Sequence, residues 1–214
     1  MGDGPDGETK LAFARQVALA LVATAQELGD PLGYYAVGNE GLTTTVAPDT
    51  TTSHYRTIGD HLHNLTPTDA PRTDAAEVVD PARARRVAGR LGSDTAFDTQ
   101  LRPFFEAADP YVHRVADQPL FHAIRLITAQ HTGTTRLIIL TDDADRTQVT
   151  EAVKAAQHNS GDVFVYLLPS ALFTEGSLQD LEGTYERYTT FESFRQDLAT
   201  LPRVRAFEVG PEDR

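Results

Sequence analysis

The chain has 214 residues, of which 40% are hydrophobic, and this is enough for one α/β domain with its own core. It contains no cysteine, which excludes disulfides, cysteine-type zinc sites and thiol catalysis. Its 19 Lys and Arg residues stand against 31 Asp and Glu residues, a net charge of −12, which argues against general nucleic-acid binding because that function needs a basic face.

The basic residues are poor in lysine. Lys10 and Lys154 are the only lysines of the sequence, and the remaining basic side chains are arginines. An acidic, Ala-, Asp- and Thr-rich chain of this kind is typical of a halophilic cytoplasmic protein, whose self-repulsion is screened by concentrated salt. A GC-rich genome would explain the arginines but not the acidity. The sequence has no apolar run long enough to span a membrane and no signal-peptide core at its start, so we expect an intracellular protein.

The first part of the chain predicts a helix, a hairpin and a second helix. Apolar residues recur at helical spacing over 11–28, and Gly29 is placed to end that helix. Segments 31–39 and 41–48 are then typical of two strands joined by a tight turn. A helix is expected to follow at 53–65.

The middle of the chain departs from this pattern. Residues 66–79 are turn-forming and acidic, and they predict a linker. Residues 80–115 are helical in character, and "DPARARRVAGRL" begins with an Asp N-cap and a proline at the first helical position. We interpret 80–115 as a helical insertion on the main domain, because it is too small to hold a core of its own.

From residue 117 onward, helices alternate with hydrophobic strands. The expected elements, in chain order, are helix 118–130, strand 135–141, helix 145–158, strand 162–168, helix 176–200 and strand 203–209. This alternation predicts an α/β fold with a doubly wound, mostly parallel sheet. We therefore expect residues 1–214 to form one domain of this class that carries the helical insertion.

The stretch "TTRLIILTDDADR", residues 134–146, contains the strongest candidate for a site. A short β-type run ends in the carboxylates of Asp142, Asp143 and Asp145, and open α/β sheets place ligand or metal chemistry at that end of a strand. Carboxylate oxygens suit hard cations such as Mg²⁺ and Ca²⁺. The structural alternative is that Asp145 or Asp143 caps the helix that follows, while its neighbours complement the helix N-terminus.

The remaining motifs are weaker. His61 and His63 are two residues apart in a predicted helix, so they point to different sides and are poorly placed to share a metal. The glycine-rich "GDGPDG" at 2–7 lacks the preceding strand of a phosphate cradle and the spaced ligands of a calcium loop. The sequence contains no GxSxG, no HExxH and no credible nucleophile–base pair.

Three segments together resemble a known family. "GETKLAFARQVALALVATAQELGDPLGYYAVGN" is similar to the first helix and second strand of the von Willebrand factor A-like domain in a prokaryotic family of unknown function, whose members accompany MoxR-type AAA+ ATPases. "DQPLFHAIRLI" followed by "TRLIILTDDAD" resembles a later helix and the strand that ends in the third metal motif. The tail "YERYTTFESFRQDLATLPRVRAFEVGP" is similar to haloarchaeal members. The resemblance covers nearly the whole chain and implies a Rossmann-type sheet.

The resemblance also implies a metal-ion-dependent adhesion site, in which a hard cation such as Mg²⁺ keeps one position open for a partner's carboxylate. Asp142 matches the third motif, with Asp143 beside it. The second position falls at Asp117–Gln118, where the family often has Thr, and the DxSxS motif of the first strand is absent. We expect an incomplete metal site drawn from Asp142, Asp143 and Asp117, with weak or no Mg²⁺ binding by this chain alone.

The opening "MGDGPDGETKL" suggests a reason for the missing motif. In that family DxSxS is commonly followed by a methionine and a polar loop, so Met1 is expected to correspond to an internal methionine and the domain to be N-terminally incomplete. The missing strand would lie between the strands at 32–38 and 135–141. Buried unpaired backbone groups cost about 1–3 kcal/mol each, so the two strands would close up, or another chain would fill the space, or the fold would be weakened.

The expected function is that of a non-enzymatic protein-interaction module with a protein partner, which the resemblance suggests is a MoxR-type ATPase. The alternative from another class is a metal-dependent phosphoesterase or nuclease that uses the Asp142 cluster. Two-metal chemistry needs carboxylates from several strand ends, and the strand ends at 37–39 and 167–169 supply none. A third alternative is a degenerate fragment without an independent role.

Overall fold

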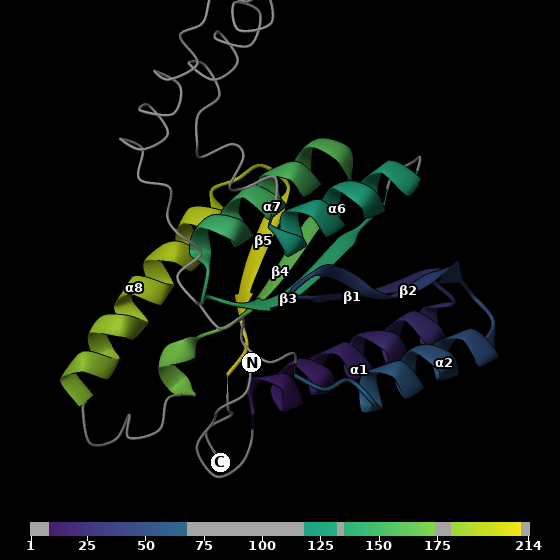
Figure 1. Cartoon of the computed structure of the whole chain (residues 1–214), viewed down its shortest axis with the longest axis horizontal. Coiled ribbons are helices and arrows are strands. Elements are labelled where there is room, and N and C mark those ends of the chain that lie inside the picture. The colour runs from purple at the N-terminus through teal and green to yellow at the C-terminus, as the bar shows by residue number, and fades with distance from the viewer. Residues whose placement is uncertain (1–8, 68–117, 132–134, 174–180, 211–214) are drawn as a thin grey trace, which may run out of the picture. The chain divides into compact units, whose positions relative to one another are not determined.

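The computed structural model of the chain describes residues 9–67, 118–131, 135–173 and 181–210 (Figure 1). The predicted helical insertion at 80–115 lies outside the described residues, and so does Asp117. Apart from Gln118, the described residues belong to one compact unit, which is formed by the chain up to Thr68 and from Pro119 onward.

Helix α1, Lys10–Leu28, begins and ends where local chemistry sets its limits. The Thr9 hydroxyl accepts a hydrogen bond from the Ala12 N–H at 3.2 Å, which satisfies one of the free donors of the first turn. Gly29 follows the last turn with a φ of 68°, a left-handed conformation that glycine adopts without steric cost. The predicted helix and its glycine stop are confirmed.

The predicted hairpin is also confirmed. Strand β1, Leu32–Gly38, pairs antiparallel with strand β2, Gly41–Asp49. Gly41 has a φ of 119°, a conformation that other residues rarely adopt, so the tight turn depends on this glycine.

Helix α2, Thr52–His63, follows the hairpin and packs against α1. Its buried face consists of Tyr55, Ile58 and Leu62, at the spacing that the sequence predicts. The Tyr55 hydroxyl donates a hydrogen bond to the Asp30 carbonyl at 2.7 Å. This bond joins α2 to the turn between α1 and β1.

The later part of the chain alternates helices and strands as predicted. The elements are α6 Pro119–Gln130, β3 Leu137–Asp142, α7 Arg146–Asn159, β4 Val163–Leu168, the short 3-10 helix η2 Ser170–Leu172, α8 Leu181–Ala199 and β5 Val204–Glu208. Strands β3, β4 and β5 pair in that order as a parallel three-stranded sheet. The described chain is therefore a mixed α/β structure with a parallel sheet at its core.

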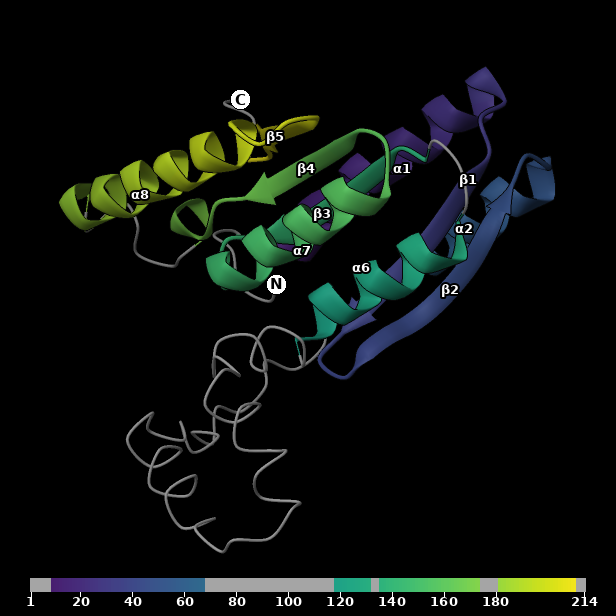
Figure 2. The same ribbon diagram turned by 90° about the horizontal axis from the view of Figure 1, so that it is seen from above.

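Different helices cover the two faces of β3. Ile139 belongs to the core that α6, α7 and α8 form with β4 and β5, whereas Leu140 packs against the cluster that includes Ala14 of α1. Neighbouring residues of a strand point to opposite faces, so α1 lies on one face of β3 and the α6–α7 layer lies on the other (Figure 2). The sequence pattern predicts helices on both faces, and β3 shows this arrangement.

The five described strands do not form one sheet. The β1–β2 hairpin and the β3–β4–β5 sheet are separate, and no ladder joins them. The predicted mostly parallel sheet is therefore present only in its β3–β4–β5 part. Among the described residues β1 pairs only with β2 and β3 pairs only with β4, so the strands at 32–38 and 137–142 have not closed up on each other.

Candidate functional site

The acidic cluster of the sequence lies at the carboxyl edge of the parallel sheet, as predicted. Asp142 is the last residue of β3, and in the β3–β4 ladder it lies opposite Leu168, the last residue of β4. Ser170 follows β4 at the same edge, and Lys10 reaches it from the first turn of α1. One edge of the sheet therefore gathers polar side chains from three parts of the chain.

Asp142 is paired with an internal cation. Its Oδ2 lies 3.2 Å from Nζ of Lys10, and its Oδ1 accepts a hydrogen bond from the Ala144 N–H at 3.3 Å. The Lys10 ammonium also donates to Oγ of Ser170 at 2.8 Å. The two charged side chains are mostly buried, with exposed fractions of 14% for Lys10 and 17% for Asp142, so solvent screens this pair less than it screens a surface pair.

Asp143 is paired with a second cation and is only 8% exposed. Its Oδ1 accepts the Ser170 N–H at 2.8 Å, and its Oδ2 accepts a hydrogen bond from Nη2 of Arg146 at 2.7 Å. Burial raises the pKa of the Asp143 carboxyl, but the hydrogen bonds from Ser170 and Arg146 and the Arg146 charge outweigh burial and hold that pKa below its ordinary value. Asp143 is thus an ionised carboxylate that ties the end of β3 to the turn after β4.

Arg146 connects this carboxylate to the neighbouring helix. Its Nη1 donates to the Thr190 carbonyl in α8 at 3.2 Å. Its guanidinium lies 5.6 Å from the centroid of the Phe194 ring. Removing Asp143 or Arg146 would therefore disturb the packing of α7 on α8 as well as the edge of the sheet.

Asp145 is the N-cap of α7, which is the structural alternative that the sequence predicts for it. Its carboxylate accepts the Gln148 N–H at 2.9 Å and caps α7. Asp142, Asp143 and Asp145 thus bond to different partners rather than converging on one point. Among the residues that the structure describes, no three His, Cys, Asp or Glu side chains are grouped so that they could hold a metal ion.

Sequence reasoning found the carboxylates of this edge but missed the groups that pair with them. Lys10 is 132 positions from Asp142 and 160 positions from Ser170, and hydrophobic periodicity does not reveal contacts between such distant residues. Arg146 carried a weak signal, because it lies three residues after Asp143 at a spacing that brings side chains together on a helix.

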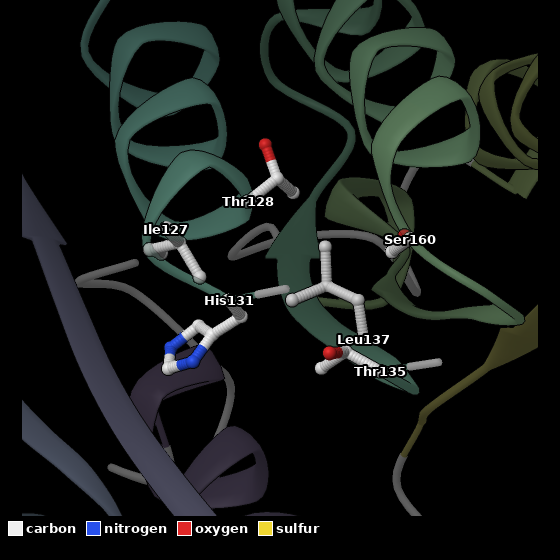
Figure 3. A pocket seen from close by; sticks show the side chains of 6 residues that line it. All are labelled: Ile127, Thr128, His131, Thr135, Leu137 and Ser160. Carbon is white, nitrogen blue, oxygen red and sulfur yellow. The ribbon is translucent and has the colours of Figure 1, made fainter. Parts of the chain in front are cut away.

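A small pocket lies at the opposite end of β3 (Figure 3). It is lined by Ile127, Thr128, His131, Thr135, Leu137 and Ser160. Nε2 of His131 and the hydroxyl of Tyr35 in β1 share a hydrogen bond of 2.6 Å, while the Ser160 hydroxyl donates to the Ala156 carbonyl. The histidine and the serine each bond elsewhere, so the pocket does not present them as a nucleophile and its base.

His61 and His63 of α2 contact different groups, as the sequence predicts. His61 stacks on Tyr34 with 6.3 Å between ring centroids, and Nδ1 of His63 lies 2.7 Å from the Gly59 carbonyl oxygen. Both side chains are exposed, and they bond to different groups. They do not form a shared ligand pair.

No protein-family profile, curated protein or solved structure matches the chain. No helix within the described ranges is long and apolar enough to cross a membrane.

Proposed function

We propose that the chain is a non-enzymatic protein-interaction module of the von Willebrand factor A-like class. The proposal is supported by a parallel sheet with helices on both faces of β3, by an α1 that begins at the carboxyl edge, and by Asp142 at the end of β3. In the family that the sequence resembles, the same edge carries a metal-ion-dependent adhesion site. In this chain the edge serves as a contact surface with a degenerate metal site.

The observation that carries the proposal is the pairing of the two described candidate ligands, Asp142 and Asp143, with internal cations. Lys10 neutralises Asp142, and Arg146 neutralises Asp143. A Mg²⁺ ion at this edge would have to displace an ammonium or a guanidinium and leave that charge without its partner, which is costly for a group that is mostly buried. A phosphoesterase or nuclease needs carboxylates that are free to hold its metals, so this arrangement favours an interaction surface.

The two aspartates differ in how far a partner can reach them. The Asp143 side chain is 5% exposed and ties β3 to the turn after β4, whereas the Asp142 side chain is 17% exposed and bonds to a lysine that also contacts Ser170. Asp142 is therefore the residue of this edge that is assigned to partner contact. A MoxR-type AAA+ ATPase is the proposed partner, and that identity rests on the sequence resemblance.

Affinity capture from a native lysate at high salt, with the captured proteins identified by mass spectrometry, tests this function. The wild-type chain is expected to retain a MoxR-type ATPase and the Asp142→Asn variant to retain less of it. Asp145→Asn is the matched control, because asparagine also caps helices and α7 should be unchanged. Capture of no ATPase by the wild-type chain would contradict the proposed partner.

The enzymatic alternative has its own test. Hydrolysis of a generic phosphoester with Mn²⁺ or Mg²⁺, abolished by Asp142→Ala but retained in Asp145→Asn, would favour a metal-dependent phosphoesterase over the interaction module. Absence of hydrolysis, together with Asp142-dependent capture, is the expected result.

A further inference from the structure

The described helices cover the two faces of the parallel sheet to different extents. Alternate residues of β4, beginning with Val163, belong to the core that includes residues of α6, α7 and α8. The residues between them point to the other face, and of these only Leu168 belongs to a core cluster, the one that contains Ala14 of α1. In both ribbon views α1 extends from the carboxyl edge toward the hairpin and away from β5 (Figures 1 and 2).

Three aromatic side chains lie side by side on the part of this face that α1 leaves uncovered. In the β4–β5 ladder Tyr166 lies opposite Phe207, and Phe164 lies opposite Arg205. The Phe207 ring stacks with Tyr166 and with Phe164, at 5.2 Å and 6.4 Å between ring centroids. Phe207 is 40% exposed, and the other two rings are half-buried. We call Phe164, Tyr166 and Phe207, together with Arg136 and Arg205 beside them, the aromatic face.

The two arginines of the aromatic face converge on one ring. The guanidinium carbon of Arg136 lies 5.8 Å from the centroid of the Phe164 ring, and that of Arg205 lies 5.6 Å from it. Both arginines are exposed. A guanidinium over a ring keeps its N–H donors at its rim, where a carboxylate can accept two of them at once. The ring contacts therefore hold two carboxylate-binding groups in place at the surface.

No carboxylate among the described residues pairs with Arg136 or Arg205. Arg195 of α8, by contrast, donates from two nitrogens to Glu192, at 2.7 Å and 2.6 Å. The chain has 31 acidic residues and 19 Lys and Arg residues, so its arginines do not lack carboxylates to choose from. Within the described ranges the aromatic face is thus a cationic, partly apolar surface on an acidic protein.

This combination favours a protein segment over a nucleic acid as the bound group. Single-stranded nucleic acids stack their bases on open aromatic rings, whereas the Phe164 ring already lies under two guanidinium groups. A polyphosphate would also be repelled by the net charge of −12 much more than a segment with a few carboxylates. Aromatic and arginine side chains are the types that are enriched in protein–protein interfaces.

We propose that the aromatic face docks an acidic segment of a partner protein, whose carboxylates bind Arg136 and Arg205 while an adjacent apolar or aromatic side chain covers Phe207. The carboxylates supply charge-assisted hydrogen bonds, and the apolar contact removes the exposed part of the Phe207 ring from water. Arg136 directly precedes β3, whereas Asp142 ends it, so this surface is separate from the edge described above. The inference goes beyond the proposed function and does not depend on the identity of its partner.

A random copolymer of glutamate and tyrosine tests the aromatic face, because it carries carboxylates beside an aromatic side chain. It is titrated into the full 214-residue chain in matched high-salt buffer, with calorimetry for the affinity and NMR for the position. Binding is expected to shift the side-chain Nε–H signals of Arg136 and Arg205 and the amide signal of Phe207. The amide signal of Ala144, which bonds to Asp142, should not shift.

Two other polymers separate the chemical classes. Polyglutamate carries carboxylates without an aromatic group and is expected to bind more weakly than the copolymer. Oligothymidylate carries phosphates and bases and is expected not to bind. If either polymer bound as tightly as the copolymer, or if the copolymer did not bind at millimolar concentration, the proposal would be overturned.

Variants of the two arginines test the carboxylate contacts. The double variant Arg136→Gln, Arg205→Gln is expected to lower the affinity for the copolymer by about tenfold or more. Arg125→Gln is the matched control, because Arg125 is also exposed and lies 6.0 Å from the centroid of a phenylalanine ring, that of Phe121, but on α6. An unchanged affinity in the double variant would contradict the proposal.

The apolar contact has its own pair of variants. Phe207→Ala removes the most exposed ring of the aromatic face and is expected to abolish the preference for the copolymer over polyglutamate. Tyr185→Ala is the control, since Tyr185 is 73% exposed on α8. Thermal unfolding checks that both variants are folded. The same loss in both variants would mean that the copolymer contacts exposed aromatic groups in general, and the proposal would be wrong.

The inference and the proposed function fail in different ways. Asp142→Asn is expected to bind the copolymer like the wild-type chain while it captures less of the ATPase. Copolymer binding without capture would remove the proposed function alone, and capture without copolymer binding would remove the aromatic face alone. Loss of copolymer binding in Asp142→Asn would overturn the assignment of a separate surface.

Discussion

The β3–β4–β5 sheet and the β1–β2 hairpin are stabilised by different interactions. Strand β4 has Val163, Val165 and Leu167 fully buried in a core that also includes residues of α6, α7 and α8. The hairpin has only Ala36 and Gly41 buried, and none of its residues belongs to that core. The parallel sheet is thus stabilised by its own hydrophobic packing, while the hairpin depends on its ladder and on contacts with α2 and α6.

Strand β3 is less completely paired and buried than its neighbour β4. An apolar strand that helices cover on both faces gains stability from pairing on both sides. Strand β4 is paired on both sides, and its Val165 and Leu167 are fully buried. The side chains of Ile138 and Leu140 are only half-buried. Within the described residues both outer strands of this sheet, β3 and β5, pair on one side only.

The largest expected change in the free energy of unfolding comes from truncating a leucine of the parallel sheet, compared with a leucine of the hairpin. Leu167→Ala in β4 removes a fully buried side chain and is expected to lower the free energy of unfolding by about 2–5 kcal/mol. Leu42→Ala in β2 makes the same chemical change at a half-buried position and is expected to cost roughly 1 kcal/mol. Urea denaturation measures both. Equal losses would show that the hairpin is packed as firmly as the parallel sheet.

The next effect concerns the edge where the parallel sheet ends. Asp143→Ala leaves the Arg146 guanidinium and the Ser170 N–H without their acceptor and is expected to cost about 1–3 kcal/mol. The native pKa of Asp143 is lowered, so its stabilisation is present above the ordinary value of 3.8 and is lost as the pH falls below it.

The difference in stability between wild type and Asp143→Ala should therefore shrink in acid, and unfolding curves at pH 7 and pH 3 would show this. Asp145→Asn, which keeps the helix cap, should stay within about 0.5 kcal/mol of wild type. A difference for Asp143→Ala that did not change with pH would argue against an ionised, paired Asp143.

A smaller effect is expected at the link between the two regions. Tyr35→Phe removes the hydroxyl that bonds to His131 and should cost about 0.5–1.5 kcal/mol. Tyr34→Phe is the neighbouring control, because Tyr34 contacts His61 through its ring. Thermal unfolding of the two variants compares them, and a larger loss for Tyr34→Phe would mean that the His131 bond does not hold the hairpin in place.

The smallest expected signal is that of Mg²⁺. Calorimetry in matched salt should detect no micromolar binding by the wild-type chain, because Lys10 and Arg146 already neutralise Asp142 and Asp143. Lys10→Met removes one of these cations and is expected to strengthen Mg²⁺ binding relative to wild type. Micromolar binding by the wild-type chain would contradict the proposal of a degenerate site.

Local features of the fold could be predicted from the sequence. Gly29 ends α1, the hairpin turns where the sequence indicates, and Asp145 caps α7. Each of these rests on a short-range rule, in which a residue type acts on backbone groups within a few positions of it. The strand and helix ranges after residue 118 follow for the same reason, since hydrophobic periodicity is also local.

Long-range features could not be predicted in the same way. The ammonium of Lys10 meets Asp142 only because α1 packs against β3, and no local pattern reports that contact. The separation of the sheet into two parts depends on which strands find partners, which is a property of the whole chain. The predicted role of Asp117 lies outside the described residues and stays a prediction.

Residue-resolved amide hydrogen exchange along β3, in the chain by itself, tests the central claim most directly. The amides of Ile139 and Thr141 point toward β4 and should exchange slowly, whereas those of Ile138 and Leu140 point to the open edge and should exchange much faster. This alternation is what an unpaired edge predicts. Uniformly slow exchange at all four amides would show that the edge is already paired and would contradict the account.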